Sequence, residues 1–448
     1  MSLSEAAQSL QADVTGTDIQ FSGCSTDTRT LSSGELFIAL RGDNFDGHDF
    51  IEQAITTGAV AAMVDRKPEN ESIPTLFVED TRRAMGDLAA AWRNKLELPI
   101  IAVTGSNGKT TVKEMLAAIL SQQADVLSTK GNLNNDIGVP LTLFSLSQEH
   151  KYAVIEMGAN HSGEIERLSS ITRPDVAVIT LCAPAHLKGF GSIDGVAKAK
   201  AEIYSGLQKE GVAIINADDD YADFWLEKVS DYKRLTFSIE NPADVNARNI
   251  HMNKTNNYPV FTLSTACAEI QIELAVFGVH NVYNALAAAA CCVALNIPLQ
   301  QIQAGLQSFQ AVNGRMQGLA GKNNCFIIND TYNANPASMQ AAINTATAAG
   351  KPCWLVIGDM GELGDISNSA HRQVGENARA AGVERLYALG PMSKHAADGF
   401  GAGAFHFEDM QALIKTLNAE LESELTVLIK GSRSMAMEQV VQALSEEN

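Results

Sequence analysis

Thr104-Gly105-Ser106-Asn107-Gly108-Lys109-Thr110-Thr111 follows an apolar run, residues 99–103, and precedes a stretch with helical periodicity. A glycine-rich turn between a buried strand and a helix is typical of nucleotide-phosphate sites, because glycine lets backbone N–H groups approach the oxygens. We expect Lys109 to reach the β- and γ-phosphates and the Thr110 hydroxyl to bind Mg²⁺. The turn departs from the GxxxxGK[ST] pattern, since residue 103 is valine. The alternative is a glycine-rich turn that binds no ligand.

Three further polar residues follow predicted elements of the same sheet. Glu156 ends the apolar run 152–155, where a carboxylate would point toward bound Mg²⁺; the alternative is a surface acid. His186 lies in the loop after the strand-like run 175–181, at the sheet edge where ligands bind; the alternative is a solvated histidine. Lys198 and Lys200 are two positions apart on a predicted helix, so at most one of them can face the site. Taken alone, this pattern indicates two surface lysines.

The order of elements predicts three domains. Short strand-like runs, 35–40 and 59–64, indicate a small mixed α/β unit, and a helical stretch then ends before Pro99. Strands and helices alternate from residue 99 to 216, which predicts βαβ units in a parallel sheet; residues 219–273 are more polar and less regular. We expect an amino-terminal domain over 1–84, a linker helix over 85–98, a central P-loop ATPase domain over 99–314 and a carboxy-terminal Rossmann-like domain over 315–448.

The last of these predicted domains begins with the strand-like run 325–330. Pro336 at a first helical position, Asn335 as its cap and Gly350 at the far end mark the helix that follows. Strand-like runs at 353–359, 384–390 and 425–434, with a helix around His371, complete a second, smaller doubly wound α/β domain. Asp330 and Tyr332 follow the first of these strands, a position that suits contact with a ligand.

Composition excludes several classes of protein. The chain has 448 residues and a formal net charge of −19, which argues against general binding to nucleic acid. Seven cysteines without a CxxC or Cys/His cluster favour a reducing compartment. The longest apolar run, 285–295, is too short to span a membrane, and the first ten residues do not form an export signal. We expect a cytoplasmic monomer that does not insert into membranes.

Together these residues resemble the Mur ligase family over essentially the whole chain. The resemblance rests on the phosphate turn, Glu156, His186, the lysine of Lys200-Ala-Glu-Ile, His280-Asn281, Arg315 and Asp330. It implies that Asn281, Arg315 and Asp330 contact the nucleotide together with Gly105, Ser106, Asn107, Gly108, Lys109, Thr110 and Thr111. It further implies a carbamylated Lys200, which with His186, Thr110 and Glu156 would hold two Mg²⁺ ions, and Mn²⁺ should substitute for them. The catalytic residues it implies are Lys109, Lys200 and His186.

Other segments indicate the branch of the family. Ser25-Thr26-Asp27-Thr28-Arg29 resembles the part that binds a UDP-sugar in the two later ligases of the pathway, and a DNP[KR]-type motif is absent. Segments containing Asn132, Asn135, Tyr332, Asn333, Asn335, Lys430 and Arg433 resemble the branch that adds a dipeptide. The resemblance therefore implies an ATP-dependent ligase that joins D-alanyl-D-alanine to UDP-N-acetylmuramoyl-tripeptide through an acyl phosphate, in peptidoglycan precursor synthesis. The alternatives are a folylpolyglutamate-synthase-like ligase and a nucleotide-gated binding protein without catalysis.

Overall fold

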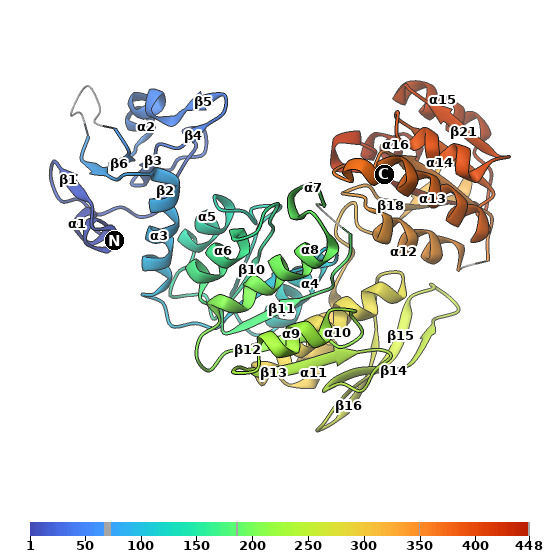
Figure 1. Ribbon diagram of the computed structural model, residues 1–448, viewed down its shortest axis with the longest axis horizontal. Helices are drawn as coiled ribbons and strands as arrows, with labels where there is room; N and C mark the ends of the chain where they lie inside the picture. The colour runs from blue at the N-terminus through green and yellow to red at the C-terminus, as the bar shows by residue number, and fades with distance from the viewer. Residues whose placement is uncertain (67–72, 185–186, 349, 447–448) are drawn as a thin grey trace.

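The computed structural model describes residues 1–66, 73–184, 187–348 and 350–446. Its strands form three main sheets, one for each part of the chain, with the central sheet lying between the other two (Figure 1). This arrangement confirms the predicted three-domain α/β architecture. In the part of the chain described, no helix is both long and apolar enough to cross a membrane.

The amino-terminal sheet has the strand order β1-β7-β6-β3-β2, with only β1 antiparallel to its neighbour. Its core packs against α1 and α3, and α3 also contacts α5 and α6 of the central part. We expected the helix that became α3 to reach residue 98, but it ends at Arg93, and the buried Leu96 and Leu98 follow outside any helix or strand. The elements are α1 Leu3–Leu10, β1 Asp13–Thr15, β2 Cys24–Ser25, β3 Leu36–Ile38, β4 Arg41–Gly42, β5 Phe45–Asp46, α2 Ile51–Thr57, β6 Ala61–Val64, β7 Thr75–Phe77 and α3 Thr81–Arg93.

The central sheet has nine strands in the order β16-β15-β14-β13-β12-β11-β8-β10-β9. Six neighbouring strands of this order, from β13 to β9, run parallel, and helices cover both faces. The parallel sheet was predicted from β8, β10, β11 and β12, whereas β9 and β13 were not predicted. The segment that seemed irregular in sequence extends this sheet, with β14, β15 and β16 pairing as an antiparallel meander. The elements are β8 Ile100–Thr104, α4 Lys109–Leu120, β9 Val126–Ser128, α5 Gly138–Phe144, β10 Tyr152–Glu156, α6 Glu164–Thr172, β11 Val176–Ile179, α7 Leu187–Phe190, α8 Ile193–Ala201, β12 Val212–Asn216, α9 Ala222–Lys228, β13 Lys233–Ser238, β14 Val245–Met252, β15 Pro259–Thr265, β16 Glu269–Glu273, α10 Val279–Ala294 and α11 Leu299–Ser308.

The carboxy-terminal sheet has the order β17-β18-β22-β19-β20-β21, and all pairs except β17 with β18 are parallel. The last strand in sequence, β22, therefore lies between β18 and β19, so the loops after these three strands meet at one edge, which faces the central part. Two elements of this sheet were not predicted, β17 and β21. The elements are β17 Gln317–Gly321, β18 Cys325–Asp330, α12 Pro336–Thr347, β19 Cys353–Gly358, α13 Ser367–Ala380, β20 Arg385–Leu389, α14 Ser393–Phe400, β21 Ala404–Phe407, α15 Met410–Glu420, β22 Thr426–Lys430 and α16 Glu438–Leu444.

Candidate functional site

The phosphate turn connects the buried strand β8 to α4, as the sequence predicts. Gly105 and Gly108 have φ angles of 150° and 81°, which L side chains rarely adopt. A Cβ atom at Gly105 would lie 1.9 Å from Thr180 Oγ1, and one at Gly108 would lie 2.4 Å from Asn284 Oδ1. Among the residues that the structure describes, no side chain caps the first turn of α4, so its N–H groups remain available to an anion. Backbone conformation and crowding both require glycine in this turn.

Hydrogen bonds to the loop after the neighbouring strand β11 hold the turn from behind. Ser106 Oγ donates a hydrogen bond to Ala183 O at 2.9 Å and accepts one from Ala183 N at 3.0 Å. Thr180 Oγ1 donates to the Asn107 carbonyl at 2.5 Å. These bonds join residues more than seventy positions apart, so the turn is fixed to the loop that follows β11.

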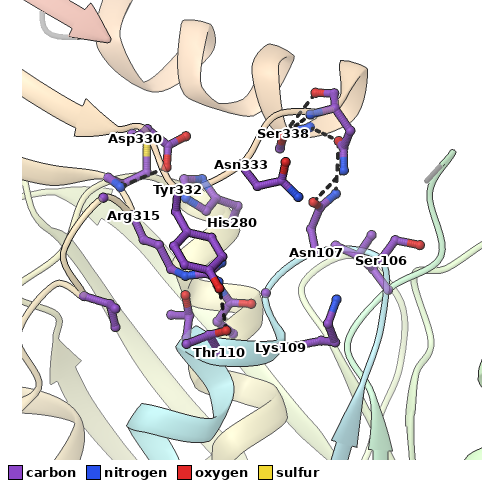
Figure 2. A pocket seen from close by; sticks show the side chains of 18 of the residues that line it. Ser106, Asn107, Lys109, Thr110, His280, Arg315, Asp330, Tyr332, Asn333 and Ser338 are labelled. Atoms are coloured by element: carbon purple, nitrogen blue, oxygen red, sulfur yellow. Dashed lines mark hydrogen bonds between the residues drawn. The ribbon is translucent and has the colours of Figure 1, made fainter. Parts of the chain in front are cut away.

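The turn opens onto a cavity of about 500 Å³ between the central and carboxy-terminal sheets. Figure 2 shows Lys109 and Thr110 on the central side of this cavity, with Arg315, Asp330 and Tyr332 on the other side. The remaining predicted nucleotide-binding and substrate-binding residues that line the cavity come from both parts of the chain: Ser106, Asn107, Gly108, Thr111, Asn132, Asn135, Glu156, Lys200, Asn281, Asn333, Asn335 and Lys430.

Oxygen atoms suited to a divalent cation meet at the start of α4. Glu156 lies at the carboxyl end of β10, next to β8, and is buried. Its carboxylate accepts hydrogen bonds from Thr110 Oγ1 at 2.8 Å and from Asn134 Nδ2 at 2.9 Å. Arg315 Nη2 donates to the same Thr110 hydroxyl at 2.8 Å. A hydroxyl and a carboxylate in contact beside a phosphate turn form a donor set that fits Mg²⁺.

Lys109 and Lys200 both face the cavity. The Lys109 ammonium donates to the Gly105 carbonyl at 2.7 Å, and burial lowers the pKa of Lys109. Lys200 is only 1% exposed, and burial, reinforced by the charge of Lys109, lowers its pKa to about 7. Lys198 is exposed on the opposite side of α8, which confirms that only one of the two helix lysines faces the site. The predicted metal ligand His186 lies outside the described residues.

The carboxy-terminal wall is organised by ion pairs and stacking. The Arg315 guanidinium lies 4.1 Å from the centre of the Tyr332 ring. Asp330 accepts a hydrogen bond from Lys430 Nζ at 2.6 Å, and Lys430 also donates to the Asn333 carbonyl at 2.8 Å. We predicted Lys430 as a substrate ligand; in this structure its ammonium is shared between Asp330 and the backbone of the loop before α12.

Asn281, which the resemblance implied as a nucleotide contact, lies at the start of α10. The residue before α10 is Gly278, and Asn281 lies in the first turn of the helix, where it is buried. Its side chain donates to Phe277 O at 2.8 Å and accepts from Asn284 Nδ2 at 2.8 Å. Asn284 in turn lies close to Gly108 of the phosphate turn. Asn281 therefore holds Asn284 in place and supports the wall of the cavity next to Gly108.

Several predicted site residues lie away from this cavity. In the amino-terminal part, Ser25 ends β2, and Thr26, Asp27 and Arg29 follow it; none of the four lines the cavity. The Arg29 guanidinium binds the Asp27 carboxylate at 2.6 Å, and this hydrogen bonding lowers the pKa of Asp27 to about 2. Arg433 is also absent from the lining and pairs with Glu438 at 3.0 Å.

Asn134 contacts Glu156 directly and was not predicted as a site residue, although its neighbours Asn132 and Asn135 were. The predicted neighbour Asn135 lines the cavity, but its Oδ1 accepts from the backbone N–H groups of Ile137 and Gly138 at the start of α5. Asn134 and Asn135 are adjacent, and only the fold determines which side chain turns toward the strand. Among the described residues, no three His, Cys, Asp or Glu side chains form a metal-binding group.

Comparisons with known proteins agree with this arrangement. Family models match three consecutive parts: the Mur ligase family, catalytic domain over 20–93, the Mur ligase middle domain over 103–292 and the Mur ligase, glutamate ligase domain over 314–433. The UDP-N-acetylmuramoyl-tripeptide–D-alanyl-D-alanine ligase of Escherichia coli (strain K12) is 46% identical, and the match covers 100% of this chain and 98% of that protein.

Solved structures extend the match to three dimensions. A crystal structure of MurF from Acinetobacter baumannii has a TM-score of 0.91 and 38% identity, and the match covers 98% of this chain and 97% of that one. A crystal structure of MurF ligase from Thermotoga maritima in complex with ADP has a TM-score of 0.84 and 26% identity, over 94% of this chain and 96% of that one. This chain belongs to the Mur ligase family.

Proposed function

We propose that this chain is an ATP-dependent ligase that adds D-alanyl-D-alanine to UDP-N-acetylmuramoyl-tripeptide, releasing ADP and phosphate. The main observation in support is the cavity in which the phosphate turn faces Arg315, Asp330 and Tyr332 of a different sheet. The names of relatives that match along the whole chain give the substrates. We further propose that the enzyme acts as a cytoplasmic monomer, with domains over 1–84, 99–314 and 315–448 and a linker over 85–98 that contains the second half of α3.

In the first step, the terminal carboxylate of the tripeptide attacks the γ-phosphorus of ATP, and the bond to the β-phosphate oxygen breaks. An acyl phosphate and ADP result. This chain offers positioning and positive charge for that step rather than a nucleophile. Backbone N–H groups of the turn would bind the phosphates, and Lys109 would leave the Gly105 carbonyl to meet the charge that develops on the β- and γ-oxygens.

The oxygen donors described above support a divalent metal at Thr110 and Glu156, since a hydroxyl and a carboxylate are ligands that Mg²⁺ prefers. When bound, such an ion would neutralise phosphate charge. A second ion would need another oxygen ligand near Lys200. The buried Lys200 amine, with its pKa of about 7, is neutral often enough to take up CO₂ and become a carbamate. We propose that this carbamate and His186 hold the second ion, and that Mn²⁺ can replace Mg²⁺.

In the second step, the free amine of D-alanyl-D-alanine attacks the acyl carbon, phosphate leaves and the amine loses a proton. The carboxy-terminal wall supplies the groups for this step. Asp330 and Lys430 pair at the end of β18 and β22, and Tyr332 and Asn333 lie just beyond them. A reaction enclosed between two domains would protect the acyl phosphate from water. We propose that Ser25, Thr26, Asp27 and Arg29 bind the distant UDP end of the substrate.

Two alternatives are less well supported. A folylpolyglutamate-synthase-like activity would not use the segment 25–29, and the E. coli relative that matches the whole chain carries a different name. A binding protein without catalysis would not need Lys109, Thr110, Glu156 and Lys200 around one cavity.

A coupled phosphate-release assay tests the proposal. We expect phosphate only when ATP, a divalent metal, UDP-N-acetylmuramoyl-tripeptide and D-alanyl-D-alanine are all present. Mass spectrometry should show the UDP-linked product heavier by the dipeptide less one water. Equal release with a folate and glutamate, or release that does not depend on the dipeptide, would overturn the assignment.

A further inference from the structure

Two asparagine side chains form a direct contact between the phosphate turn and the carboxy-terminal sheet. Asn335 Nδ2 donates a hydrogen bond to Asn107 Oδ1 at 2.8 Å, and Asn107 Nδ2 lies 3.4 Å from Asn335 Oδ1. The two residues are 228 positions apart in sequence. Figure 2 shows Asn107 directed from the turn toward the end of α12, where Ser338 lies. The pair is a reciprocal amide contact between two domains.

Asn335 is held rigidly by its own domain. It caps α12, and its Oδ1 accepts from Ser338 N at 2.9 Å. Ser338 Oγ accepts in turn from Asn335 N at 3.1 Å, which completes a capping box. Because the amide oxygen must face the helix N–H, the Asn335 amide cannot flip, and its NH₂ group points outward.

Asn107 is held equally firmly by the central domain. Its carbonyl accepts a hydrogen bond from Thr180 Oγ1. The hydroxyl of the preceding Ser106 donates a hydrogen bond to Ala183 O and accepts one from Ala183 N. The Asn107 side chain has only two rotatable bonds. A short side chain on a fixed backbone can therefore meet a short side chain on a capped helix in only one arrangement of the two domains.

We propose that Asn107 and Asn335 are a docking pair that positions the carboxy-terminal domain over the phosphate turn. Both are positioning residues: they would act by holding Tyr332, Asp330 and Lys430 at a fixed place relative to Lys109. The proposal that this pair docks the two domains rests on geometry. Only its expected effect on turnover rests on the proposed function. This role also differs from the direct substrate contact that the sequence indicated for Asn335.

The test uses variants that remove the contact from either side. Asn335→Ser keeps a good helix cap but is too short to reach Asn107, whereas Asn335→Ala removes the cap as well. Asn107→Ser removes the contact and leaves α12 untouched. The double variant Asn107→Ser/Asn335→Ser completes a double-mutant cycle. Domain geometry is measured in the full chain, with ADP and Mg²⁺ present, as the distance distribution between spin labels on unnatural amino acids at the exposed positions Lys228 and Lys394.

We expect each serine variant to broaden the distance distribution and to lower kcat by about 2- to 12-fold, the range for one net hydrogen bond. In Asn335→Ser, KM for ATP and the melting temperature should both stay near the wild-type values, while Asn335→Ala should melt at a lower temperature. The double variant should be no slower than the slower single variant. If Asn335→Ser fails to fold, Asn107→Ser gives the same answer.

Wild-type distance distributions in both single variants would overturn the proposal. The proposal would also be overturned if the fold-losses of kcat in the two single variants multiplied in the double variant. Such a result would mean that the two residues act separately, as residues that each contact the substrate would. Absence of phosphate release from the wild-type enzyme would instead refute the proposed function, and the distance measurement would still decide whether the pair docks the domains.

Discussion

Lys109 and Lys200 carry two amines into one cavity, and burial lowers the pKa of both. A buried ammonium is unfavourable without a partner, so each position favours either an arriving anion or loss of the charge. Lys109 lies on a turn built to receive phosphate, which supplies the anion. Lys200 lies at the end of a helix where no phosphate turn is present, and its neutral amine is available for reaction with CO₂. The same physical cause therefore leads to two different proposed roles.

Replacing Lys109 tests the first role. Lys109→Ala should lower kcat by about 1,000-fold or more, because the charge stabilises the transition state of phosphoryl transfer. The fold should be intact, since removing a buried ammonium relieves a desolvation cost. Phosphate release and the thermal midpoint measure these two effects. Near-normal turnover would contradict the assignment of the phosphate turn.

Replacing Lys200 tests the carbamate. Lys200→Ala should lose activity, and acetate at high concentration should restore part of it by supplying a carboxylate in the vacated space. Incubation of the wild-type enzyme with ¹³C-bicarbonate should give a carbamate signal by NMR that is absent from the variant. Lys198→Ala is the matched control, because Lys198 is exposed on the same helix, and it should be nearly silent. Full activity of Lys200→Ala would exclude the carbamate.

At the scale of elements, the helices and strands that were predicted correctly are those whose signals lie within the segment itself. The parallel strands of the central sheet are continuous apolar runs between helices, and Asn335 with Pro336 marks the start of α12 correctly. The meander was missed because its strands are half-buried and partly polar: β16 is Glu-Ile-Gln-Ile-Glu, with only Ile272 fully covered. The end of α3 was missed because Leu96 and Leu98 are buried although they lie outside the helix, and apolar character alone does not distinguish a buried helix from a buried loop.

The loop after β19 gives a prediction about pH. His371 on α13 is fully buried; its Nε2 accepts from Met360 N at 2.9 Å, and Nδ1 lies 2.7 Å from Ser367 O. Burial lowers the pKa of His371 below 6.5. As pH falls below 6.5, the unfolded chain binds a proton that the folded chain does not, so the free energy of unfolding should decrease, with no such change above 6.5. Protonation would also remove the acceptor for Met360.

Denaturant unfolding at several pH values between 5 and 8 measures this effect. His371→Gln should be less stable at pH 8 because a buried side chain is replaced, but its stability should change less between pH 6.5 and 5 than that of the wild type. If the free energy of unfolding changes equally with pH in the wild type and in His371→Gln, other groups cause the pH dependence.

At the scale of the whole molecule, the candidate site could be predicted only as separate segments. The phosphate turn and Glu156 were found from local patterns, whereas Lys200 was identified only through the resemblance to the family, because its local pattern indicated a surface lysine. The contacts of the phosphate turn with Arg315 and Asn335 join residues about two hundred positions apart, and no local pattern encodes such pairs. The structure also places the segment 25–29 outside the cavity, so the proposed substrate must extend from one domain to another. A long substrate held at both ends would allow binding at one site to be changed without disturbing the other.

Arg29 provides the test of this separation. Deleting the amino-terminal domain would be a poor test, because Met85 and Leu88 of α3 are buried in its core and would become exposed. Arg29 is exposed and paired only locally with Asp27, so Arg29→Ala should preserve the fold. Loss of a charge-assisted contact to the UDP end should raise KM for UDP-N-acetylmuramoyl-tripeptide by about 10-fold or more, with KM for ATP and for the dipeptide unchanged.

A truncated substrate and a matched variant make the assignment specific. Muramoyl-tripeptide without the UDP group should be a poor substrate, and the wild type and Arg29→Ala should use it equally, because the group that Arg29 binds is missing. Arg372→Ala, which removes an exposed arginine paired with Glu376 on α13 of the carboxy-terminal domain, should leave all three KM values unchanged. If Arg29→Ala behaves like Arg372→Ala with the complete substrate, or if its KM for ATP rises in parallel, the UDP end binds elsewhere.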